Sequence, residues 1–290
     1  MSLAPGARVV VVGAGTMGHG IAHVAASSGY RVTLVDTTDE LIERGLSMVR
    51  ANLQGGIERG KLTEQARDET LGRLRGSTDL EGAARDAELV IEAIPERFDL
   101  KVALFDRLEG AARADTILAT NTSSLSITDL QERIGRPQRM IGLHFFNPVH
   151  IMQLVEVVRG LSSDEAVVQA GVAFAKSLGR DPILVNDSPG FASSRLGIAL
   201  GLEAMRMVEE GVASAADIDK AMELGYRHPM GPLKLTDLVG LDVRLDIARY
   251  LHDKLGAEHF RPPMILEQLV AEGKLGKKSG HGFYDWNAES

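Results

Sequence analysis

The chain contains no cysteine. It can therefore form neither a disulfide nor a thiolate metal site, and its chemistry must come from other side chains. It also lacks an excess of positive charge, because its formal net charge is −8, and this argues against a nucleic-acid partner. Hydrophobic residues make up 44% of the chain and charged residues 25%, which is the composition of an ordinary globular protein rather than a disordered one.

Long apolar runs are absent as well. No run approaches the roughly 20 residues that a membrane-spanning helix needs. The N-terminus leads almost directly into the first predicted strand, without the basic and apolar regions of a signal peptide. We therefore expect a cytoplasmic protein with no membrane partner. Its 290 residues make two domains the favoured organisation.

The most informative segment is Arg8–Gly20, in which a run of valines is followed by the pattern G-x-G-x-x-G and a helical stripe. The first glycine permits a tight turn, the second lets backbone amides approach a pyrophosphate, and the third lets the helix pack closely on the sheet. The N-terminus of that helix would face the phosphates. The predicted cofactor contacts in this loop are Gly13, Gly15, Thr16, Met17 and Gly18.

Asp36 ends the next predicted strand, close to the spacing of about 20 residues at which an acidic side chain binds the ribose of NAD. Its charge would repel a 2′-phosphate, and Thr37 and Thr38 follow it where an Arg could have received one, so NAD is favoured over NADP. The alternative is a βαβ unit that binds no ligand or another nucleotide. His19 and His23 lie one helical turn apart but lack an acidic third ligand, so we expect no metal site.

Apolar strands and helical patterns alternate through the first two thirds of the chain. This alternation predicts an α/β fold, a Rossmann-like doubly wound and mostly parallel sheet. A long charged helical insertion is expected at about 39–75, broken near residues 54–56 and again at Gly60. The later strands are predicted at 89–95, 116–121, 140–144 and 154–158, and the helices at 101–113 and 164–178.

The pattern changes at the turn-rich segment Asn186–Gly190, after which helical stripes dominate. We therefore predict an NAD-binding domain at 1–187 and a C-terminal all-helical domain at 188–290. Its helices are expected at 189–210, 214–224, 233–255 and 263–272, with Ser214 as an N-cap. The first of these is apolar over a wide surface, which indicates a core helix, a subunit interface, or both.

His144 is the candidate base among the eight histidines, because it lies at the end of a predicted strand, where doubly wound folds bind ligands. A dehydrogenase needs a group that takes the alcohol proton, and histidine titrates nearest neutrality. Glu156 interrupts the next apolar strand, where a carboxylate is costly unless it is paired. A partnership with His144 would hold the imidazole in one tautomer. Glu156 at a solvated edge is the alternative.

Together these residues resemble the L-3-hydroxyacyl-CoA dehydrogenase family, and most closely its short 3-hydroxybutyryl-CoA dehydrogenases. The likeness covers almost the whole chain and joins several rare blocks in order. Besides the glycine loop and Glu156, the blocks that carry it are Asn121–Ser124, His144–Pro148, Asp187–Phe191, His228–Pro232, Asp237–Asp242 and Gly282–Tyr284.

The resemblance implies NAD-dependent oxidation of an (S)-3-hydroxyacyl-CoA, and the reverse reduction, by a homodimer. It also implies that the helical domain at 188–290 serves substrate binding and dimerisation. His144 would remove the hydroxyl proton and Glu156 would orient it. Ser123 would hydrogen-bond the reacting oxygen and Asn147 would hold the substrate near the base. Further contacts to NAD are implied for Asn121, Ser123, Glu96 and Lys101. Without the resemblance, the segment 121–124 is an ordinary polar turn and Asn147 is a residue set by the following proline.

One position departs from the family pattern. Many members carry an asparagine immediately before the arginine that follows Pro-Gly-Phe, whereas this chain has Ser194 before Arg195. A hydroxyl has a shorter reach and fewer hydrogen bonds than an amide. We therefore expect Ser194 to keep a weaker form of the substrate contact.

Basic residues of the insertion are candidates for binding the phosphates of CoA. The nearest are Arg50, Arg59 and Lys61, although surface cations more often form only a solvated face. Two other functions remain open at this point. One is a dehydrogenase of a non-CoA hydroxy acid or sugar acid, and the other is a non-catalytic NAD-binding or structural protein.

Overall fold

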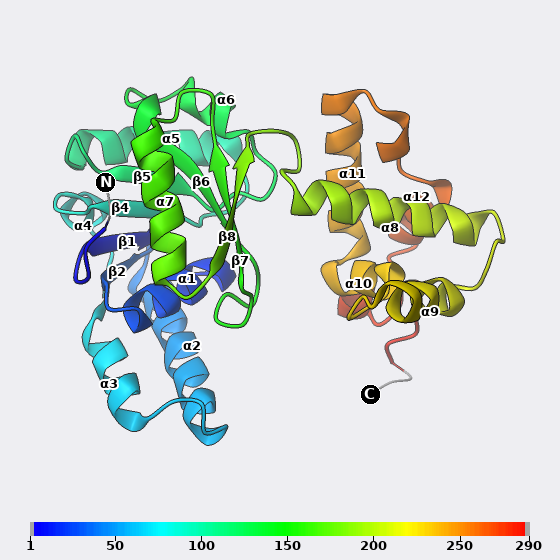
Figure 1. Ribbon diagram of the computed structural model, residues 1–290, viewed down its shortest axis with the longest axis horizontal. Helices are drawn as coiled ribbons and strands as arrows, with labels where there is room; N and C mark the ends of the chain where they lie inside the picture. Colours follow the sequence, from blue (N-terminus) through cyan, green and yellow to red (C-terminus); the bar gives the residue numbers. More distant parts are fainter. Residues whose placement is uncertain (1–2, 288–290) are drawn as a thin grey trace. The chain divides into compact units, whose positions relative to one another are not determined.

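The protein is described here by a computed structural model that covers residues 3–287. Its contacts divide the chain into two compact units, Met1–Ser188 and Pro189–Ser290. The division lies one residue beyond the boundary expected from the sequence. The first unit contains the sheet, and the second is built from helices (Figure 1).

The first unit is a single sheet of eight strands in the order β3-β2-β1-β4-β5-β6-β7-β8. Neighbouring strands are parallel except β6 and β7, which are antiparallel, so the predicted doubly wound and mostly parallel sheet is confirmed. The strands are β1 (Arg8–Val12), β2 (Arg31–Val35), β3 (Leu74–Ser77), β4 (Leu89–Glu92), β5 (Ile117–Thr120), β6 (Met140–Phe145), β7 (Leu154–Arg159) and β8 (Asp181–Asn186).

Helices cover both faces of this sheet (Figure 1). On one face α1 and α7 pack on the apolar side chains of the central strands and close a continuous core. Burial of apolar surface on this scale is the main stabilising contribution to such a unit. The helices are α1 (Thr16–Ser27), α2 (Asp39–Glu58), α3 (Glu64–Gly72), α4 (Leu80–Ala84), α5 (Phe98–Ala111), α6 (Ile127–Gln131) and α7 (Glu165–Ser177).

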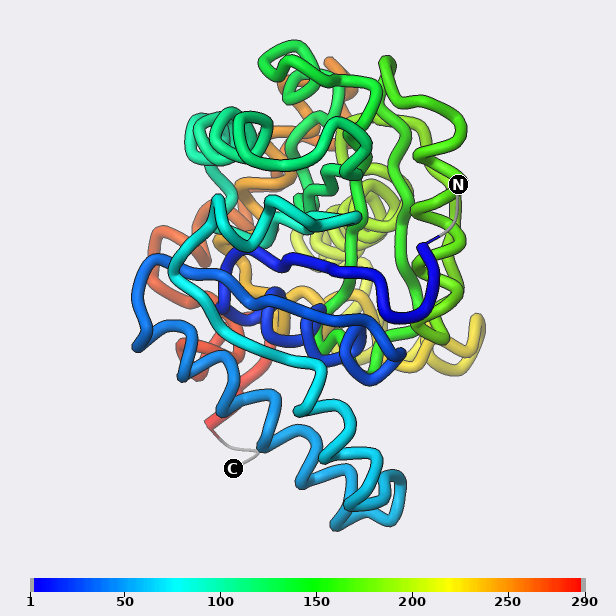
Figure 2. Tube along the Cα trace, turned by 90° about the vertical axis from the view of Figure 1, so that its left-hand side faces the viewer, coloured from blue at the N-terminus to red at the C-terminus, as the bar shows by residue number. Residues whose placement is uncertain are grey.

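The insertion after β2 consists of α2 and α3, which lie side by side (Figure 2). Thr38 caps α2 by accepting a hydrogen bond from the amide of Leu41. The break predicted near residues 54–56 is wrong, because α2 continues through Gly55 and Gly56 to Glu58. Helical hydrogen bonding outweighs the weak propensity of two glycines here. The chain does turn at Gly60, whose φ is +66°.

Two strands were not predicted. β3 has the sequence Leu-Arg-Gly-Ser and carries almost no apolar pattern, and β8 is largely exposed at the sheet edge. A strand that buries neither face lacks the alternation by which strands are recognised in a sequence. Both strands are held by their pairing with β2 and β7.

The second unit surrounds its own apolar core. Its helices are α8 (Ser193–Glu209), α9 (Ala215–Tyr226), α10 (Pro232–Val239), α11 (Leu241–Leu255) and α12 (Met264–Ala271). Ser214 caps α9 as predicted, accepting from the amide of Asp217 at 3.2 Å. The single helix predicted at 233–255 is wrong: Gly240, at φ +107°, separates α10 from α11. This backbone conformation is open to glycine and strained for other residues.

Asp237 links the C-terminal segment to α10. Its carboxylate accepts hydrogen bonds from the amides of Phe283 and Tyr284 and from the indole of Trp286, at 2.9–3.0 Å. The hydroxyl of Tyr284 donates to Asp219 at 2.7 Å. The buried carboxylate of Asp237 is thus hydrogen-bonded by three protein donors, and hydrogen bonds of this kind offset the cost of burying a charge. No helix within residues 3–287 has both the length and the apolar character that crossing a membrane requires.

Candidate active site

The glycine loop joins β1 to α1, and within it the backbone atoms of Gly13 and Gly18 are in close contact. A Cβ on Gly18 would overlap the carbonyl oxygen of Gly13, and Gly13 itself has φ +101°. Gly15 differs, because a Cβ there would meet open space. The N-terminus of α1 has no side-chain cap and no acidic residue in its first turn. Its amides are therefore available to an anion placed above Gly15.

Asp36 lies directly after β2 and faces this loop. One of its carboxylate oxygens accepts the amide of Ala14 and the other accepts the amide of Thr37, both at 2.7 Å. The second of these oxygens also accepts from the hydroxyl of Thr37 at 3.3 Å, whereas the first has a further lone pair with which to accept a hydroxyl. A narrow glycine turn, an uncapped helix N-terminus and a carboxylate at the neighbouring strand end fit the pyrophosphate and ribose of NAD.

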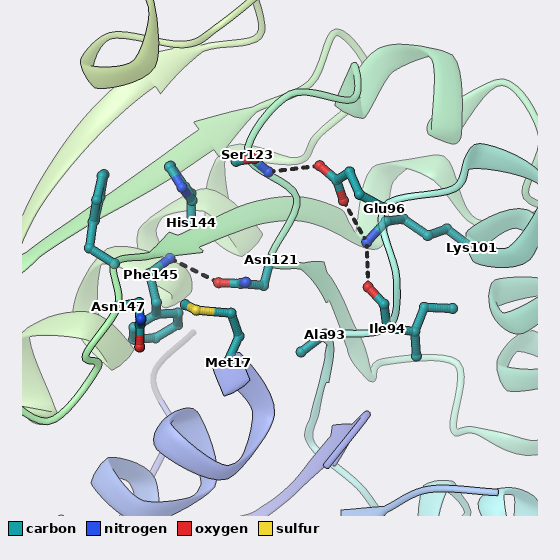
Figure 3. Close-up of a pocket in the computed structure, with 11 residues that line it drawn as sticks. Met17, Ala93, Ile94, Glu96, Lys101, Asn121, Ser123, His144, Phe145 and Asn147 are labelled. Carbon is teal, nitrogen blue, oxygen red and sulfur yellow. Dashed lines mark hydrogen bonds and ion pairs between the residues drawn. The ribbon is translucent and has the colours of Figure 1, made fainter. Parts of the chain in front are cut away.

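A pocket of about 330 Å³ opens beyond the carboxyl ends of the central strands (Figure 3). It brings together residues that are far apart in the sequence, from the first turn of α1, the β4–α5 connection, α5, and the ends of β5 and β6. The site residues predicted from the sequence that line it are Met17, Glu96, Lys101, Asn121, Ser123, His144 and Asn147. Ligands of open α/β sheets bind at this edge.

His144 and Glu156 are paired across the antiparallel strands β6 and β7. His144 Nδ1 lies 2.7 Å from a carboxylate oxygen of Glu156. Glu156 is fully buried and His144 is 6% exposed. The contact expected from the sequence is therefore present, and the solvated-edge alternative for Glu156 is wrong. A carboxylate that accepts from Nδ1 leaves Nε2 as the nitrogen able to take a proton.

Lys101 forms the second charged group of the pocket. It is 1% exposed, although it lies on α5, and its ammonium contacts Glu92 at 2.6 Å and Glu96 at 3.1 Å. The Lys101–Glu96 contact is drawn in Figure 3. Burial works against ionisation of Glu96, but the charge of Lys101 and the hydrogen bond from Thr122 outweigh it, so its pKa lies below the ordinary value. The result is a cation held in place between two carboxylates.

Glu92 was missed at the sequence level. It is fully buried in β4 and accepts from Lys101, from the amide of Ile94 and from the hydroxyl of Thr120. Burial raises the pKa of Glu92, against the opposing effect of Lys101. The signal that singled out Glu156, a carboxylate inside an apolar strand, is also present at Leu89–Glu92 and could have found it.

Two polar residues of the pocket are held by hydrogen bonds to neighbouring residues. Asn121 accepts the backbone amide of Phe145 at 2.9 Å, which couples the ends of β5 and β6 (Figure 3). The amide of Ser123 donates to Glu96 at 3.0 Å. Asn147 is exposed at the rim of the pocket, and Phe146 lies against the His144 ring with centroids 4.4 Å apart. Asn121 and Ser123 are therefore held by the protein before any ligand binds.

The three candidate CoA-binding residues, Arg50, Arg59 and Lys61, do not all lie together. Arg50 pairs with Glu43 on the exposed face of α2. Arg59 and Lys61 instead line a second pocket of the first unit, of about 660 Å³, between α1, the end of α2 and the start of β8. His23, His150 and Arg180 line the same pocket. Ser194 is partly exposed in the first turn of α8, in the second unit.

His19 and His23 make other contacts in the structure. His19 Nδ1 lies 2.8 Å from the carbonyl of Gly15, and the His23 ring lies 5.8 Å from that of His150. Within the described part of the chain, His, Asp and Glu side chains are nowhere grouped three or more together in a way that could hold a metal ion.

Comparison with known proteins matches this architecture over nearly the whole chain. The family described as "3-hydroxyacyl-CoA dehydrogenase, NAD binding domain" matches residues 8–188, and "3-hydroxyacyl-CoA dehydrogenase, C-terminal domain" matches residues 190–286. A probable 3-hydroxybutyryl-CoA dehydrogenase of Bacillus subtilis is 44% identical over 98% of this chain and 98% of its own length. A 3-hydroxyadipyl-CoA dehydrogenase of Escherichia coli is also 44% identical, over 97% of this chain and 59% of that protein.

Among solved structures, the (S)-3-hydroxybutyryl-CoA dehydrogenase of Ralstonia eutropha superposes with a TM-score of 0.94. It is 41% identical in sequence, and the match covers 96% of this chain and 98% of that one. Sequence and fold therefore agree over both units.

Proposed function

The chain belongs to the 3-hydroxyacyl-CoA dehydrogenase family and is an NAD-dependent oxidoreductase, and we propose that it interconverts (S)-3-hydroxybutyryl-CoA and acetoacetyl-CoA with His144 as the base. The observation that carries the assignment of the base is the 2.7 Å contact between the buried His144 and Glu156 at the pocket. The relatives named above include both a 3-hydroxybutyryl-CoA and a 3-hydroxyadipyl-CoA dehydrogenase, so the acyl chain is the part of the proposal that rests on family likeness.

NAD, when bound, accepts the hydride that leaves carbon 3 of the substrate. His144 takes the hydroxyl proton on Nε2, and the resulting imidazolium is stabilised by Glu156, which accepts from Nδ1. In the reverse direction the same nitrogen returns the proton. Ser123 hydrogen-bonds the reacting oxygen, and Asn147 holds the substrate near the base. The ion pair of Lys101 with Glu96 would line the nicotinamide side of bound NAD.

Reduction of acetoacetyl-CoA, followed at the absorbance band of NADH, tests the proposal. Wild-type protein is expected to oxidise NADH rapidly and NADPH poorly, because Asp36 stands where a 2′-phosphate would have to bind. His144→Ala should lose about 10²–10⁴ of kcat, the usual contribution of a general base. His281→Ala, at a half-exposed histidine of the second unit, is the matched control and should turn over normally. Tight NADH binding without turnover of acetoacetyl-CoA would exclude this substrate.

CoA binding is proposed at the second pocket of the first unit. Arg59, Lys61 and Arg180 present three cations there, and cations of this kind bind phosphate groups. Arg50 is a weaker candidate, because its ion pair with Glu43 already satisfies it. We expect Arg59→Ala and Lys61→Ala each to raise the KM for acetoacetyl-CoA more than they change kcat.

A homodimer through the second unit is proposed from its exposed apolar side chains. Leu196 on α8 is 71% exposed, and Leu224 and Tyr226 at the end of α9 are 73% and 76% exposed. Large apolar side chains left in water mark an interaction surface. Sedimentation velocity would test the dimer. The cytoplasmic location expected from the sequence stays a prediction, which cell fractionation would test.

A further inference from the structure

A third cavity of the first unit, of about 510 Å³, lies at the amino ends of β1, β2 and β3. The pocket that contains His144 lies instead beyond the carboxyl ends of the central strands. The charged residues that line the third cavity are Arg8, Arg31, Arg73, Arg75 and Asp86. Four cations and one carboxylate therefore meet there, in a chain whose net charge is −8. The proposed reaction uses none of them.

Strand pairing places three of these arginines on one face of the sheet. Arg8, the first residue of β1, is opposite Arg31, the first residue of β2. Arg75 of β3 is opposite Thr33 of β2. Side chains two residues apart on a strand point to the same side, so Arg31 and Thr33 share a face with the arginines paired to them. The valines between these positions belong to the core on the other face, beneath α1.

The acidic group of this cavity already has a partner. Within the described part of the chain, Asp86 is the only acidic residue that lines the cavity, and it forms an ion pair with Arg8 at 2.5 Å. Arg73 is engaged as well, because its guanidinium donates to Glu69 and to the carbonyl of Ala26, both at 3.3 Å. Two of the four arginines therefore have partners in the protein.

Arg31 and Arg75 are the two that remain. Among residues 3–287, neither forms an ion pair with a carboxylate. Arg75 is nevertheless held in place, because its Nε donates to the hydroxyl of the buried Thr33 at 3.0 Å. That contact leaves its two terminal nitrogens for a ligand. Like charges gathered in one cavity repel each other, and an anion bound between them relieves the repulsion.

The spacing of these two arginines suits a ligand with two adjacent phosphate groups. Neighbouring strands lie about 4.8 Å apart and two residues along a strand span about 6.6 Å, so the Cα atoms of Arg31 and Arg75 are about 8 Å apart. Each guanidinium can bind a phosphate through two parallel hydrogen bonds. The apolar residues Val10, Leu74 and Ala83 line the same cavity. An organic group attached to the phosphates can pack against them.

We propose that this cavity is a phosphate-binding site separate from those of NAD and CoA, and that its ligand is a small molecule with two adjacent phosphate groups. Inorganic pyrophosphate and a nucleoside diphosphate share this chemistry. A nucleic acid is disfavoured, because the site is a closed cavity on a chain of net negative charge. The inference goes beyond the proposed function, since none of the residues that carry it takes part in the reaction.

Isothermal titration calorimetry with inorganic pyrophosphate and with ADP tests the inference. The full chain is kept saturated with NADH and CoA, so that the sites of the proposed function are filled. Wild-type protein is expected to bind both probes at one site, and tighter binding of ADP would identify an organic ligand. The double variant Arg31→Gln, Arg75→Gln should bind both probes about tenfold or more weakly, the order expected for charge-assisted hydrogen bonds.

The double variant Arg113→Gln, Arg133→Gln is the matched control. It removes the same charge from the same unit, at two exposed arginines outside the cavity. It should bind both probes as the wild type does. Equal weakening in the two double variants would show a general attraction for anions and overturn the inference. Sulfate that binds as tightly as pyrophosphate at equal ionic strength would overturn it too.

Binding to the wild type decides the remaining outcomes. If neither probe binds, the inference is overturned and the proposed function stands, because the oxidation of NADH by acetoacetyl-CoA is measured separately. If the cavity variant does not fold, chemical modification of wild-type arginines by phenylglyoxal replaces it. Pyrophosphate should protect Arg31 and Arg75 but not Arg113, as mass spectrometry of the digested protein would show. Equal modification of Arg31 and Arg75 with and without pyrophosphate would overturn the inference.

Discussion

At the scale of single residues, the buried charges of the first unit are arranged as pairs. Glu156 has His144, and Glu92 has Lys101 together with a backbone amide and a hydroxyl. Each pair satisfies charges that would otherwise be costly in the core. In both cases the pair borders the pocket, so the same contacts that make burial tolerable also hold the reacting groups in position.

Glu156→Gln is expected to lower kcat by about 10²–10⁴ while changing KM little. The amide keeps the shape of the carboxylate, but it no longer stabilises the imidazolium, and it can hold His144 in the wrong tautomer. Steady-state kinetics of NADH oxidation with acetoacetyl-CoA gives both constants.

Glu165→Gln serves as the control for that variant, because Glu165 is an exposed carboxylate paired with Arg159 in the same unit. It should have wild-type kinetics. Full activity in Glu156→Gln would contradict a positioning role for Glu156.

At the scale of elements, the turn between β1 and α1 depends on contacts that leave no space for a side chain. Gly18→Ala should reduce NADH affinity by tenfold or more, because its Cβ would overlap the Gly13 carbonyl and the first turn of α1 would have to move. NADH fluorescence titration measures the effect. Gly110→Ala is the control, since a Cβ at that helical position meets no atom within 4 Å. Equal affinity in both variants would contradict this account of the loop.

The elements predicted correctly from the sequence are those that a pattern of neighbouring residues indicates. Val9–Val12 reads as a buried strand, and the glycines that follow read as a turn into a helix, because each feature lies within a few residues of the next. The break at Gly240 was missed, because the helical spacing of apolar residues continues from α10 into α11. A single glycine within such a pattern does not show by itself whether the helix ends there. β3 and β8 depend on pairing with strands that are distant in the chain.

At the scale of the whole molecule, acid should destabilise the first unit through His23. Burial, followed by the charges of His150, His19 and Arg180, lowers the pKa of His23 from 6.5 to about 4. Below about pH 6.5 the unfolded chain therefore binds a proton at this histidine that the folded chain does not bind until the pH nears 4. The free energy of unfolding falls over that range. The loss between pH 7 and 4.5 is on the order of 2 kcal/mol for this group.

His23→Gln should accordingly show a smaller fall in Tm between pH 7 and pH 4.5 than the wild type. Differential scanning calorimetry at the two pH values measures it. His281→Gln is the control, because His281 is half exposed beside Asp285 and should follow the wild type. A fall in His23→Gln as large as that of the wild type would show that other groups carry the acid sensitivity.

The sequence was sufficient for the sheet class, the glycine turn into α1, the place of Asp36 at the end of β2 and the partnership of His144 with Glu156. These features follow from short-range patterns and from the cost of burying a charge. It was not sufficient for the Glu92–Lys101–Glu96 group or for the placing of Arg59 beside Arg180. Nor could it reveal that Arg244 is buried without a counter-ion among residues 3–287. These features depend on which side chains the packing of distant elements brings together, and periodicity along the chain carries no record of such contacts.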